Sequence, residues 1–435
     1  MQVTDRSGWV ATAGNYKAFP TLAGETKADW LVIGGGFTGL AAARRLAELH
    51  PNDRIVLIDR KKLGQGASGR NSGFAVMREM PGPGELEKPA SRAGYLASAA
   101  IHQAAGTEVK RLVETLKIEC DYDPNGYIFA VHERSKFKAL EERAKAINDL
   151  GGEAKVLDAA ALKSRLGISF YNHGLWLGGG NALLQPARFA KGLIDNLPRS
   201  VEAYENTEAV KIDHEPGGGA TVTLRDGHIR AKRIVIGLNA FMPRLGIKQG
   251  RVFPISLTAS LTRPLTAAEE EAIGRAVPWG GLCPVEGGAT VRLTNDRRIL
   301  MRNTAEYEPD GISAAMLAKR REWHEMGLRH RFPFLAKDAI EFTWSGHMCA
   351  SRNGTFVFEE MSKGVFAAGC YNGAGVARGT LLGKLMAEHA SGETSPLIEN
   401  ALTQEKPSWV PTGAFFTMVA KIRLAHELRV AKSEH

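Results

Sequence analysis

The sequence has few cysteines, no long apolar run and no block of like charges. Its 435 residues include four cysteines, and no two of them form the Cys-x-x-Cys pair typical of zinc sites. We therefore expect no metal site and no disulfide framework, which fits a reducing cytoplasm. No stretch reaches the roughly 18 apolar residues of a membrane-spanning helix, and residues 1–27 lack the apolar region of a signal peptide. These absences predict a cytoplasmic location.

The charge pattern argues against nucleic acid as a partner. The chain has 56 Lys and Arg against 47 Asp and Glu, a formal net charge of +9. These charges are scattered, without the basic cluster that nucleic acid requires. We interpret the excess as a basic face that draws in an anionic substrate. The length indicates two domains, or one domain with a large insertion.

The clearest motif lies at Trp30–Gly39, where an apolar run precedes the glycine pattern G-x-G-x-x-G. We expect the apolar run to form a buried parallel strand and residues 40–49 to form the following helix. Gly34 permits the tight turn, Gly36 lets the backbone approach a pyrophosphate, and Gly39 lets the helix lie close to the sheet. The N–H groups at the start of such a helix are free to hold an anion. The motif predicts a dinucleotide site.

A second apolar strand is predicted at residues 54–58, directly before Asp59. A carboxylate about twenty residues after the last glycine accepts hydrogen bonds from a ribose 2′-OH, whereas it repels a 2′-phosphate. This context favours a bound dinucleotide over a chance glycine turn in an unliganded βαβ unit.

Another glycine-rich turn lies near the C-terminus. Residues 365–368 are typical of a strand, Gly369–Gly379 is rich in glycine, and a helix is expected to run to His389. A helix N-terminus suits the N1/C2=O edge of a flavin, because reduction places negative charge there. NAD needs only the first glycine site, so the presence of both turns indicates FAD.

A third glycine-rich segment, Lys61–Gly73, follows Asp59. Its glycines, together with Ser68, Arg70 and Asn71, indicate a backbone that passes close to a ligand and donates hydrogen bonds to it. A plain flexible loop is the alternative that this stretch alone leaves open.

The order of the predicted elements indicates an α/β protein with two interleaved domains. A Rossmann-type, glutathione-reductase-like FAD-binding domain is predicted for residues 1–78, 182–248 and 344–400. An inserted α+β substrate domain built on an antiparallel sheet is predicted for residues 79–181 and 249–343. Within the first domain we expect a meander of strands at 209–212, 220–224 and 229–232, and then a separate buried strand at 233–237. Residues 401–435 form a C-terminal tail.

These motifs resemble the D-amino-acid-oxidase superfamily of FAD-dependent oxidoreductases, which includes glycine and sarcosine oxidases. The resemblance spans nearly the whole chain and is carried by Val32–Leu40, Asp59, Gly66–Gly73, Arg233–Ala240, Gly369–Gly375 and Gly383–Glu388. The form Gly-Ala-Ser-Gly-Arg-Asn and the aromatic N-terminal segment are most similar to the branch that contains γ-glutamylputrescine oxidoreductase. We expect that segment, with Trp9 and Pro20, to pack on the surface of the nucleotide domain.

The resemblance implies that substrate lies over one flavin face. The carbon that bears the amine then gives a hydride to flavin N5, and water hydrolyses the resulting imine. Relatives that bind a free α-amino acid often place an arginine shortly after a Trp-x-Gly, where this chain has His347 and Met348. The cysteine that binds FAD covalently in sarcosine oxidases would align near Gly346, three positions from Cys349, so non-covalent FAD is expected. In sarcosine oxidases a lysine that activates oxygen lies on a hairpin strand, which we predict here at residues 298–304. This strand has no lysine at the matching position, so both O2 and quinone stay open as electron acceptors.

The predicted site residues come from the glycine-rich turns and from strand ends. The cofactor-binding set is Gly34, Gly36, Phe37, Thr38, Gly39, Asp59, Arg60, Gly66, Ala67, Ser68, Arg70, Asn71, Ser72, Val210, Asn239, Gly373, Ala374, Gly375 and Val376. The catalytic set is Arg70, Asn71, Arg302, His347 and Tyr371. Arg302 is expected to face either the flavin or solvent, and His347 either orients a substrate group or is structural.

The predicted function is FAD-dependent oxidation of the C–N bond of a secondary amine or an N-substituted amino acid. The alternative is oxidation of a C–OH bond in a 2-hydroxy acid or alcohol, which an arginine-lined pocket suits equally. A third hypothesis, a flavin module for nucleic-acid modification or a multisubunit complex, lacks support from any basic cluster or fused second enzyme domain. In the tail, Gly413–His435, apolar and basic residues alternate. This pattern predicts an amphipathic helix that lies on a membrane surface or, as we favour, docks on the parent domain.

Overall fold

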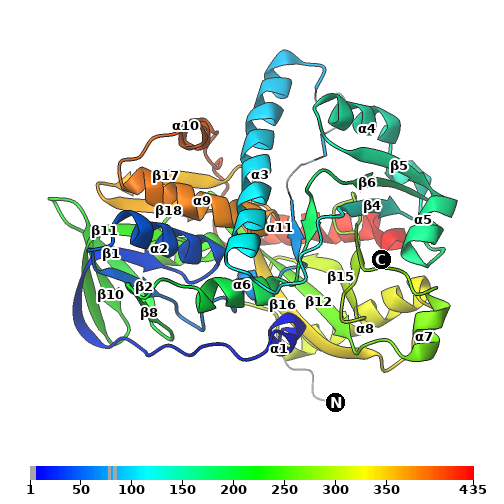
Figure 1. Cartoon of the computed structure of the whole chain (residues 1–435), viewed down its shortest axis with the longest axis horizontal. Coiled ribbons are helices and arrows are strands. Elements are labelled where there is room, and N and C mark those ends of the chain that lie inside the picture. The colour runs from blue at the N-terminus through cyan, green and yellow to red at the C-terminus, as the bar shows by residue number, and fades with distance from the viewer. Residues whose placement is uncertain (1–5, 77–79, 82–85) are drawn as a thin grey trace.

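The computed structural model describes residues 6–76, 80–81 and 86–435 (Figure 1). The domain border predicted between residues 78 and 79 lies outside the described residues. Two large sheets form the framework, and helices cover them (Figure 1).

The first sheet has eight strands, in the order β17-β18-β11-β1-β2-β8, with β10 and β9 continuing antiparallel from β11. β18, β11, β1, β2 and β8 are mutually parallel, and β17 is antiparallel to β18. The strands are β1 (Gly24–Ile33), β2 (Ile55–Ile58), β8 (Val201–Tyr204), β9 (Ala209–His214), β10 (Ala220–Leu224), β11 (Gly227–Ile236), β17 (Val357–Ser362) and β18 (Val365–Gly369). The strands predicted at 229–232 and 233–237 are therefore one continuous strand, because β11 runs long enough to pair with both β10 and β1.

Strand β1 is buried on both faces because its side chains alternate between two cores. Trp30 and Val32 belong to the core on the helical face, whereas Leu31 and Ile33 belong to the core under the β9–β10 meander. This double burial explains why the last four residues of the strand, Trp30 to Ile33, are all apolar.

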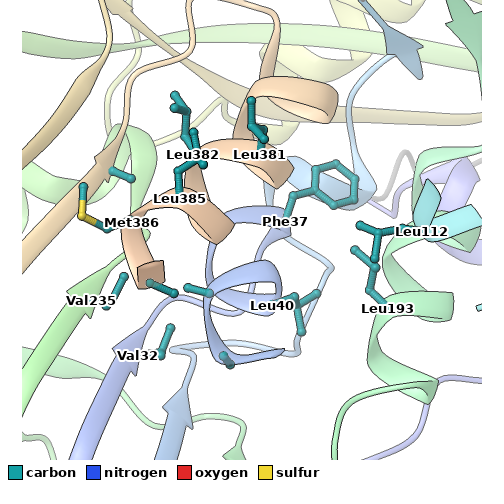
Figure 2. Packing of buried hydrophobic residues seen from close by; sticks show 14 of the residues in the cluster. Val32, Phe37, Leu40, Leu112, Leu193, Val235, Leu381, Leu382, Leu385 and Met386 are labelled. Carbon is teal, nitrogen blue, oxygen red and sulfur yellow. The ribbon is translucent and has the colours of Figure 1, made fainter. Parts of the chain in front are cut away.

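Four helices pack around the helical face of the first sheet: α2 (Phe37–Leu49), α3 (Pro89–Thr115), α6 (Pro186–Asp195) and α9 (Gly375–Ala390). Figure 2 shows Phe37 of α2 beside Leu112 of α3 and Leu193 of α6, with Leu381 of α9 nearby. The predicted assignment of α3 to the substrate domain is therefore wrong for its buried face, which lies in the core of the first domain.

The second sheet also has eight strands, in the order β16-β12-β15-β14-β13-β4-β6-β5. It is antiparallel except where β13 pairs in parallel with β4. The strands are β4 (Tyr127–Val131), β5 (Ala154–Asp158), β6 (His173–Leu177), β12 (Val252–Thr262), β13 (Trp279–Leu282), β14 (Thr290–Leu293), β15 (Ile299–Glu306) and β16 (Ile340–Ser351). Since β16 pairs with β12, the border predicted at residue 344 falls inside a strand of the second sheet.

Short elements complete the two domains. β3 (Phe74–Ala75) and β7 (Ala182–Leu183) form a two-stranded sheet. The remaining helices of the second domain are α4 (Leu140–Asp149), α5 (Ala159–Leu166), α7 (Ala267–Ala272) and α8 (Ala314–Arg331), with the 3₁₀ turn η2 (Arg134–Lys136). The first domain adds the 3₁₀ turns η1 (Ala67–Gly69) and η3 (Asn239–Leu245). Strands β5 and β13 and helix α7 were not predicted.

The N-terminal segment packs differently from the prediction. Its helix α1 (Gly8–Thr12) buries Trp9 against Ala187, Leu261 and Trp344, which belong to α6 and to strands of the second sheet. Trp9 therefore lies in a core between the two domains and not on the surface of the nucleotide domain.

The C-terminal segment consists of α10 (Pro396–Thr403), α11 (Ala414–Val430) and the 3₁₀ turn η4 (Lys432–Glu434). Helix α11 passes beside the second sheet toward the C-terminus (Figure 1). Among the residues that the structure describes, no helix combines the length and apolarity needed to cross a bilayer.

Candidate functional site

A cavity of about 1310 Å³ is lined by both sheets, by the three glycine-rich turns and by α11. One part lies at the carboxyl ends of β1 and β2, where parallel sheets bind ligands. The other part lies against β12, β14, β15 and β16 of the second sheet. Residues from both ends of the chain therefore meet in one site.

The first glycine turn has the close contacts that its motif predicts. Gly34 has a φ of +106°, which disfavours any residue with a side chain. A Cβ on Gly39 would lie 1.7 Å from the carbonyl oxygen of Gly34, so only glycine lets α2 start this close to the strand. Gly36 is the N-cap of α2 and lines the cavity. The N-terminus of α2 thus opens on the cavity, where N–H groups that lack an intrahelical partner can bind an anion.

Asp59 follows β2 and lines the cavity. Its two carboxylate oxygens accept hydrogen bonds from the backbone N–H of Gly35 at 2.8 Å and of Lys61 at 2.7 Å. Burial raises the pKa of this carboxyl, while the two N–H donors and Arg60 oppose the increase. The backbone fixes the carboxylate, and each oxygen keeps a second lone pair for a ribose hydroxyl.

The loop after Asp59 is held by its own side chains. Ser68 Oγ accepts the backbone N–H of Phe37 at 2.9 Å and so joins this loop to the start of α2. Asn71 donates to the carbonyls of Ala67 and Ser68 and accepts the N–H of Gly73. The Asn71 amide is therefore engaged within the loop, and the structure gives it a structural role beside its place in the cavity wall.

Arg70 links this loop to the second sheet. Its guanidinium donates to the carbonyl of Gln65 at 3.1 Å and to the carbonyl of Ser345 at 2.9 Å. In return, Trp344 Nε1 donates to the Arg70 carbonyl at 3.0 Å. Arg70 lines the cavity and also joins the loop to β16.

Arg292 on β14 also binds this loop, and it was not among the predicted site residues. Its Nη1 donates to the carbonyls of Ser72 at 2.6 Å, Gly73 at 3.3 Å and Leu184 at 2.9 Å. The guanidinium also lies over the ring of Trp9, 5.4 Å from its centroid. Burial lowers the pKa of Arg292 to about 10. No local motif marks this residue, because its partners are backbone groups far away in the sequence.

The last glycine turn is conformationally unusual. Cys370 and Asn372 have φ values of +61° and +49°, in the left-handed region that residues with side chains rarely adopt. Asn239 stabilises this turn, since its Oδ1 accepts the backbone N–H of Cys370 at 2.9 Å. The turn leads into α9, whose N-terminus opens on the cavity at Gly375 and Val376.

Tyr371 lines the cavity wall, but its hydroxyl points to another element. It forms a 2.8 Å hydrogen bond with Thr38 Oγ1 on α2. The ring is buried, and burial raises the pKa of the phenol well above its usual value. Tyr371 therefore connects the first and last glycine turns, and the structure places its hydroxyl away from a role as catalytic acid or base.

Nearly all predicted cofactor-binding residues border the cavity: Gly34, Gly36, Phe37, Thr38, Asp59, Arg60, Gly66, Ala67, Ser68, Arg70, Asn71, Ser72, Asn239, Gly373, Ala374, Gly375 and Val376. Gly39 is not part of the wall and acts through packing. Val210 is half exposed on β9, and its neighbour Ala209 lines the cavity instead. Successive residues of a strand face opposite sides, so the side chain of Val210 points away from the cavity and its contact with the cofactor stays a prediction.

Arg302 on β15 lines the part of the cavity that lies against the second sheet, so it faces the cavity and not bulk solvent. Its Nε and Nη2 donate to Thr290 Oγ1 at 3.1 and 2.7 Å, and Nη2 also donates to the Gly288 carbonyl at 3.3 Å. Burial lowers its pKa, and the ionisable neighbour that opposes this is the thiol of Cys283. Within the described chain, no carboxylate forms an ion pair with Arg302.

His347 borders the cavity from β16. Its Nε2 lies 3.2 Å from the Glu308 carbonyl oxygen, and its ring packs against Phe241 with centroids 5.5 Å apart. These contacts fix the imidazole at the cavity wall. Cys349 on the same strand is buried, and a hydrogen bond with Cys370 together with burial raises the pKa of its thiol. A protonated thiol is a poor nucleophile for a covalent link to a cofactor.

Helix α11 forms a wall of the cavity on the side of the second sheet. No pattern in the sequence predicts this contact. Phe416 packs against Phe253 and Tyr307, with ring centroids 5.1 and 5.3 Å apart. Val419, Ala420, Arg423, Leu424, Glu427 and Leu428 also line the cavity. The helix therefore docks on the parent domain, as favoured, but its apolar residues occupy two faces and not the single face of an amphipathic helix.

The cavity fits FAD on structural grounds. The N-termini of α2 and α9 both open on it, and neither of these two fully described helices has an acidic side chain in its first turn. The first N-terminus suits a pyrophosphate, and the second suits the flavin edge that becomes negative on reduction. Asp59 lies at the position expected for the ribose.

Comparison with known proteins agrees with this geometry. A model of the family described as "FAD dependent oxidoreductase" matches residues 29–389. A probable oxidoreductase of Rhizobium meliloti (strain 1021), named OrdL, is 28% identical over 417 residues, covering 94% of this chain and 93% of the relative. The γ-glutamylputrescine oxidoreductase of Escherichia coli (strain K12) is 26% identical over 400 residues, covering 89% of each chain. The glycine oxidase structure from Geobacillus kaustophilus superposes with a TM-score of 0.71 at 18% identity, covering 87% of this chain and 99% of that one.

Proposed function

The chain belongs to the DAO family of FAD-dependent oxidoreductases, and from this premise we propose that it oxidises the C–N bond of a secondary amine or an N-substituted amino acid that carries a carboxylate. FAD held at the first and last glycine turns would supply the hydride acceptor for the carbon next to the amine nitrogen. The names of a curated relative and of the superposed structure, a γ-glutamylputrescine oxidoreductase and a glycine oxidase, support an amine as the reacting group.

Arg302 supports the proposal that the substrate carries a carboxylate. A guanidinium that is buried without a carboxylate partner is costly, and a bound anion offsets much of that cost. Thr290 and Gly288 engage Nε and Nη2 of Arg302, while no such bond is recorded for Nη1 in the described chain. Arg302 lines the same cavity as the flavin turns, so a carboxylate held there orients the amine end of the substrate toward the flavin.

The other residues of the chain position and shield the reaction. The N-terminus of α9 opens on the cavity, and its backbone N–H groups would stabilise the negative charge that a flavin edge gains on reduction. The Arg70 contact with β16 fixes the loop beside the substrate, and α11 covers the cavity. We propose that Arg302 holds the substrate, and that Arg70, Asn71 and Tyr371 act by positioning.

Anaerobic mixing with candidate substrates tests the reaction. Secondary amines, N-alkyl amino acids and γ-glutamyl amines are expected to bleach the flavin absorbance, whereas bleaching by 2-hydroxy acids alone would sink the amine proposal in favour of alcohol oxidation. Readmission of air then identifies the acceptor. Rapid recolouring with peroxide indicates O2, and recolouring only with an added quinone indicates a dehydrogenase.

The substitution Arg302→Met tests the carboxylate contact. Loss of a charged hydrogen bond is expected to lower kcat/KM for an N-alkyl amino acid by about 10- to 100-fold. The methyl ester of the same substrate has no carboxylate, so its kcat/KM is expected to change little. Arg329→Met, which removes an exposed charge on α8, serves as the matched control. An equal loss with acid and ester would contradict the assigned role of Arg302.

A further inference from the structure

The outer face of α11 exposes large apolar side chains to water. We define this outer face as Phe415, Met418 and Ile422, which recur at helical spacing (i, i+3, i+7). Phe415 is 62% exposed, Met418 53% and Ile422 63%. Trp409, just before the helix, is also more than half exposed. Six of the eleven exposed large apolar side chains of the described chain therefore lie between Trp409 and Val430.

The opposite face of α11 is already occupied. Phe416, Ala420 and Leu424 line the substrate cavity, so the helix cannot turn its outer face inward without opening the site. A helix that is apolar on two faces is normally covered on both. Clustered exposed apolar side chains mark an interaction site more often than scattered ones do.

The helix is also fixed along its length. Lys421 Nζ lies 2.7 Å from the Glu308 carboxylate. After the helix ends, the Glu434 carboxylate accepts the backbone N–H groups of His132 at 2.7 Å and Glu133 at 3.0 Å. Arg331 donates to the Glu434 carbonyl at 2.6 Å. These contacts hold the outer face in a constant orientation, as a preformed surface.

The charges around this surface are mainly positive. Arg429 is exposed on α11 and Lys432 follows it, whereas Arg423, also exposed, forms ion pairs with Glu286 and with Glu427, the one acidic residue of the helix. The whole chain carries a net charge of +9. Two copies of such a chain repel each other, whereas an anionic lipid surface attracts it.

We propose that the outer face of α11 docks on the surface of an anionic lipid bilayer. Phe415, Met418 and Ile422 enter the headgroup region, and the neighbouring cations contact lipid phosphates. Binding of this kind lies parallel to the membrane plane and requires no spanning helix. It places the cavity wall formed by α11 next to the bilayer, whichever electron acceptor the enzyme uses.

Vesicle sedimentation of the FAD-loaded enzyme tests the proposal. The wild type is expected to sediment with vesicles of phosphatidylcholine and phosphatidylglycerol, less with phosphatidylcholine alone, and less as salt increases. The double variant F415D/I422D is expected to reduce partitioning by at least about tenfold, because two large apolar groups no longer leave water. Val277→Asp is the matched control, since Val277 is 70% exposed but lies in the second domain before β13.

Three results would overturn the proposal. The first is no sedimentation of the wild type with anionic vesicles at low salt, and the second is equal sedimentation of F415D/I422D and wild type. The third is a wild-type dimer in light scattering that the double variant converts to a monomer, which would assign the outer face to a second copy. Amine-dependent flavin bleaching is expected to be the same in the wild type and in F415D/I422D. Failure of the membrane proposal therefore does not contradict the proposed reaction.

Discussion

The contact between α2 and α9 allows a test of whether helix packing determines the conformation of the first and last glycine turns. Gly383 on α9 lies against the backbone of Thr38 on α2, and a Cβ on Gly383 would sit 2.2 Å from the Thr38 carbonyl oxygen. Cβ atoms essentially never approach closer than 3.0 Å, so Gly383→Ala must separate the two helices by roughly 0.8 Å, the difference between these distances. Because Thr38 is in the first turn of α2 and bonds to Tyr371, this shift reaches both glycine turns.

The size of the effect follows from two opposing terms. Replacing a helical glycine by alanine stabilises a helix by roughly 0.5–1 kcal/mol. Overpacking a buried contact costs about 1–3 kcal/mol. The difference between the two terms is a net destabilisation of about 0–2.5 kcal/mol for Gly383→Ala, with a central value of roughly 1 kcal/mol. Gly94→Ala in α3 is the matched control, because its Cβ would meet nothing within 4 Å and only the stabilising term applies.

Thermal unfolding measures both variants. Far-UV circular dichroism reports the global melt, and flavin fluorescence reports release of the cofactor. We expect Gly94→Ala to melt at or above the wild-type temperature, and Gly383→Ala to melt lower and release flavin earlier. Equal melting of the two variants would refute the idea that the helix contact at Gly383 controls the flavin turns.

Two further predictions concern buried polar residues. Arg292→Met removes the donor shared by the carbonyls of Ser72 and Gly73, at the end of the 61–73 loop, and of Leu184. The Kd for FAD in a fluorescence titration is therefore expected to increase by about tenfold or more. Arg230→Met, which breaks an exposed ion pair on β11, is the control and is expected to leave this Kd unchanged. His324 is fully buried, and burial lowers its pKa from 6.5 to about 3. The unfolded chain then binds a proton that the native state excludes, so stability falls as the pH drops from 6.5 toward 3, by up to about 1.4 kcal/mol per unit. Urea unfolding of His324→Asn is expected to show a flatter pH dependence in this range, and an unchanged slope would contradict this role.

The cofactor half of the protein could be predicted because its signals are local. The family match and the superposed fold confirm the predicted α/β architecture and FAD as the cofactor. Gly34, Gly36 and Gly39 are spaced by the geometry of one turn, and Asp59 follows the next strand. Such constraints act within a few residues or along one βαβ unit, so they are visible as a pattern. The domain borders and the roles of single residues stay predictions.

The substrate half was harder to predict, since its residues are brought together only by long-range pairing. Arg302 carries no motif, and its burial depends on the pairing of β15 with β14 and on the cover that α11 provides. On β9 it is Ala209 and not the predicted Val210 that lines the cavity, because the face of a strand is set by register and not by composition.

By itself, the sequence determined the two glycine turns, the carboxylate that follows the second strand and the family to which the chain belongs, since each rests on the limits of a short segment. Only the tertiary structure decided that α3 packs in the first domain, that Arg292 binds the 61–73 loop and that α11 forms a wall of the cavity. The physical reason is that burial and hydrogen-bond partners depend on which distant segments meet, and an apolar helix or a lone arginine is compatible with many such partners until the fold selects one.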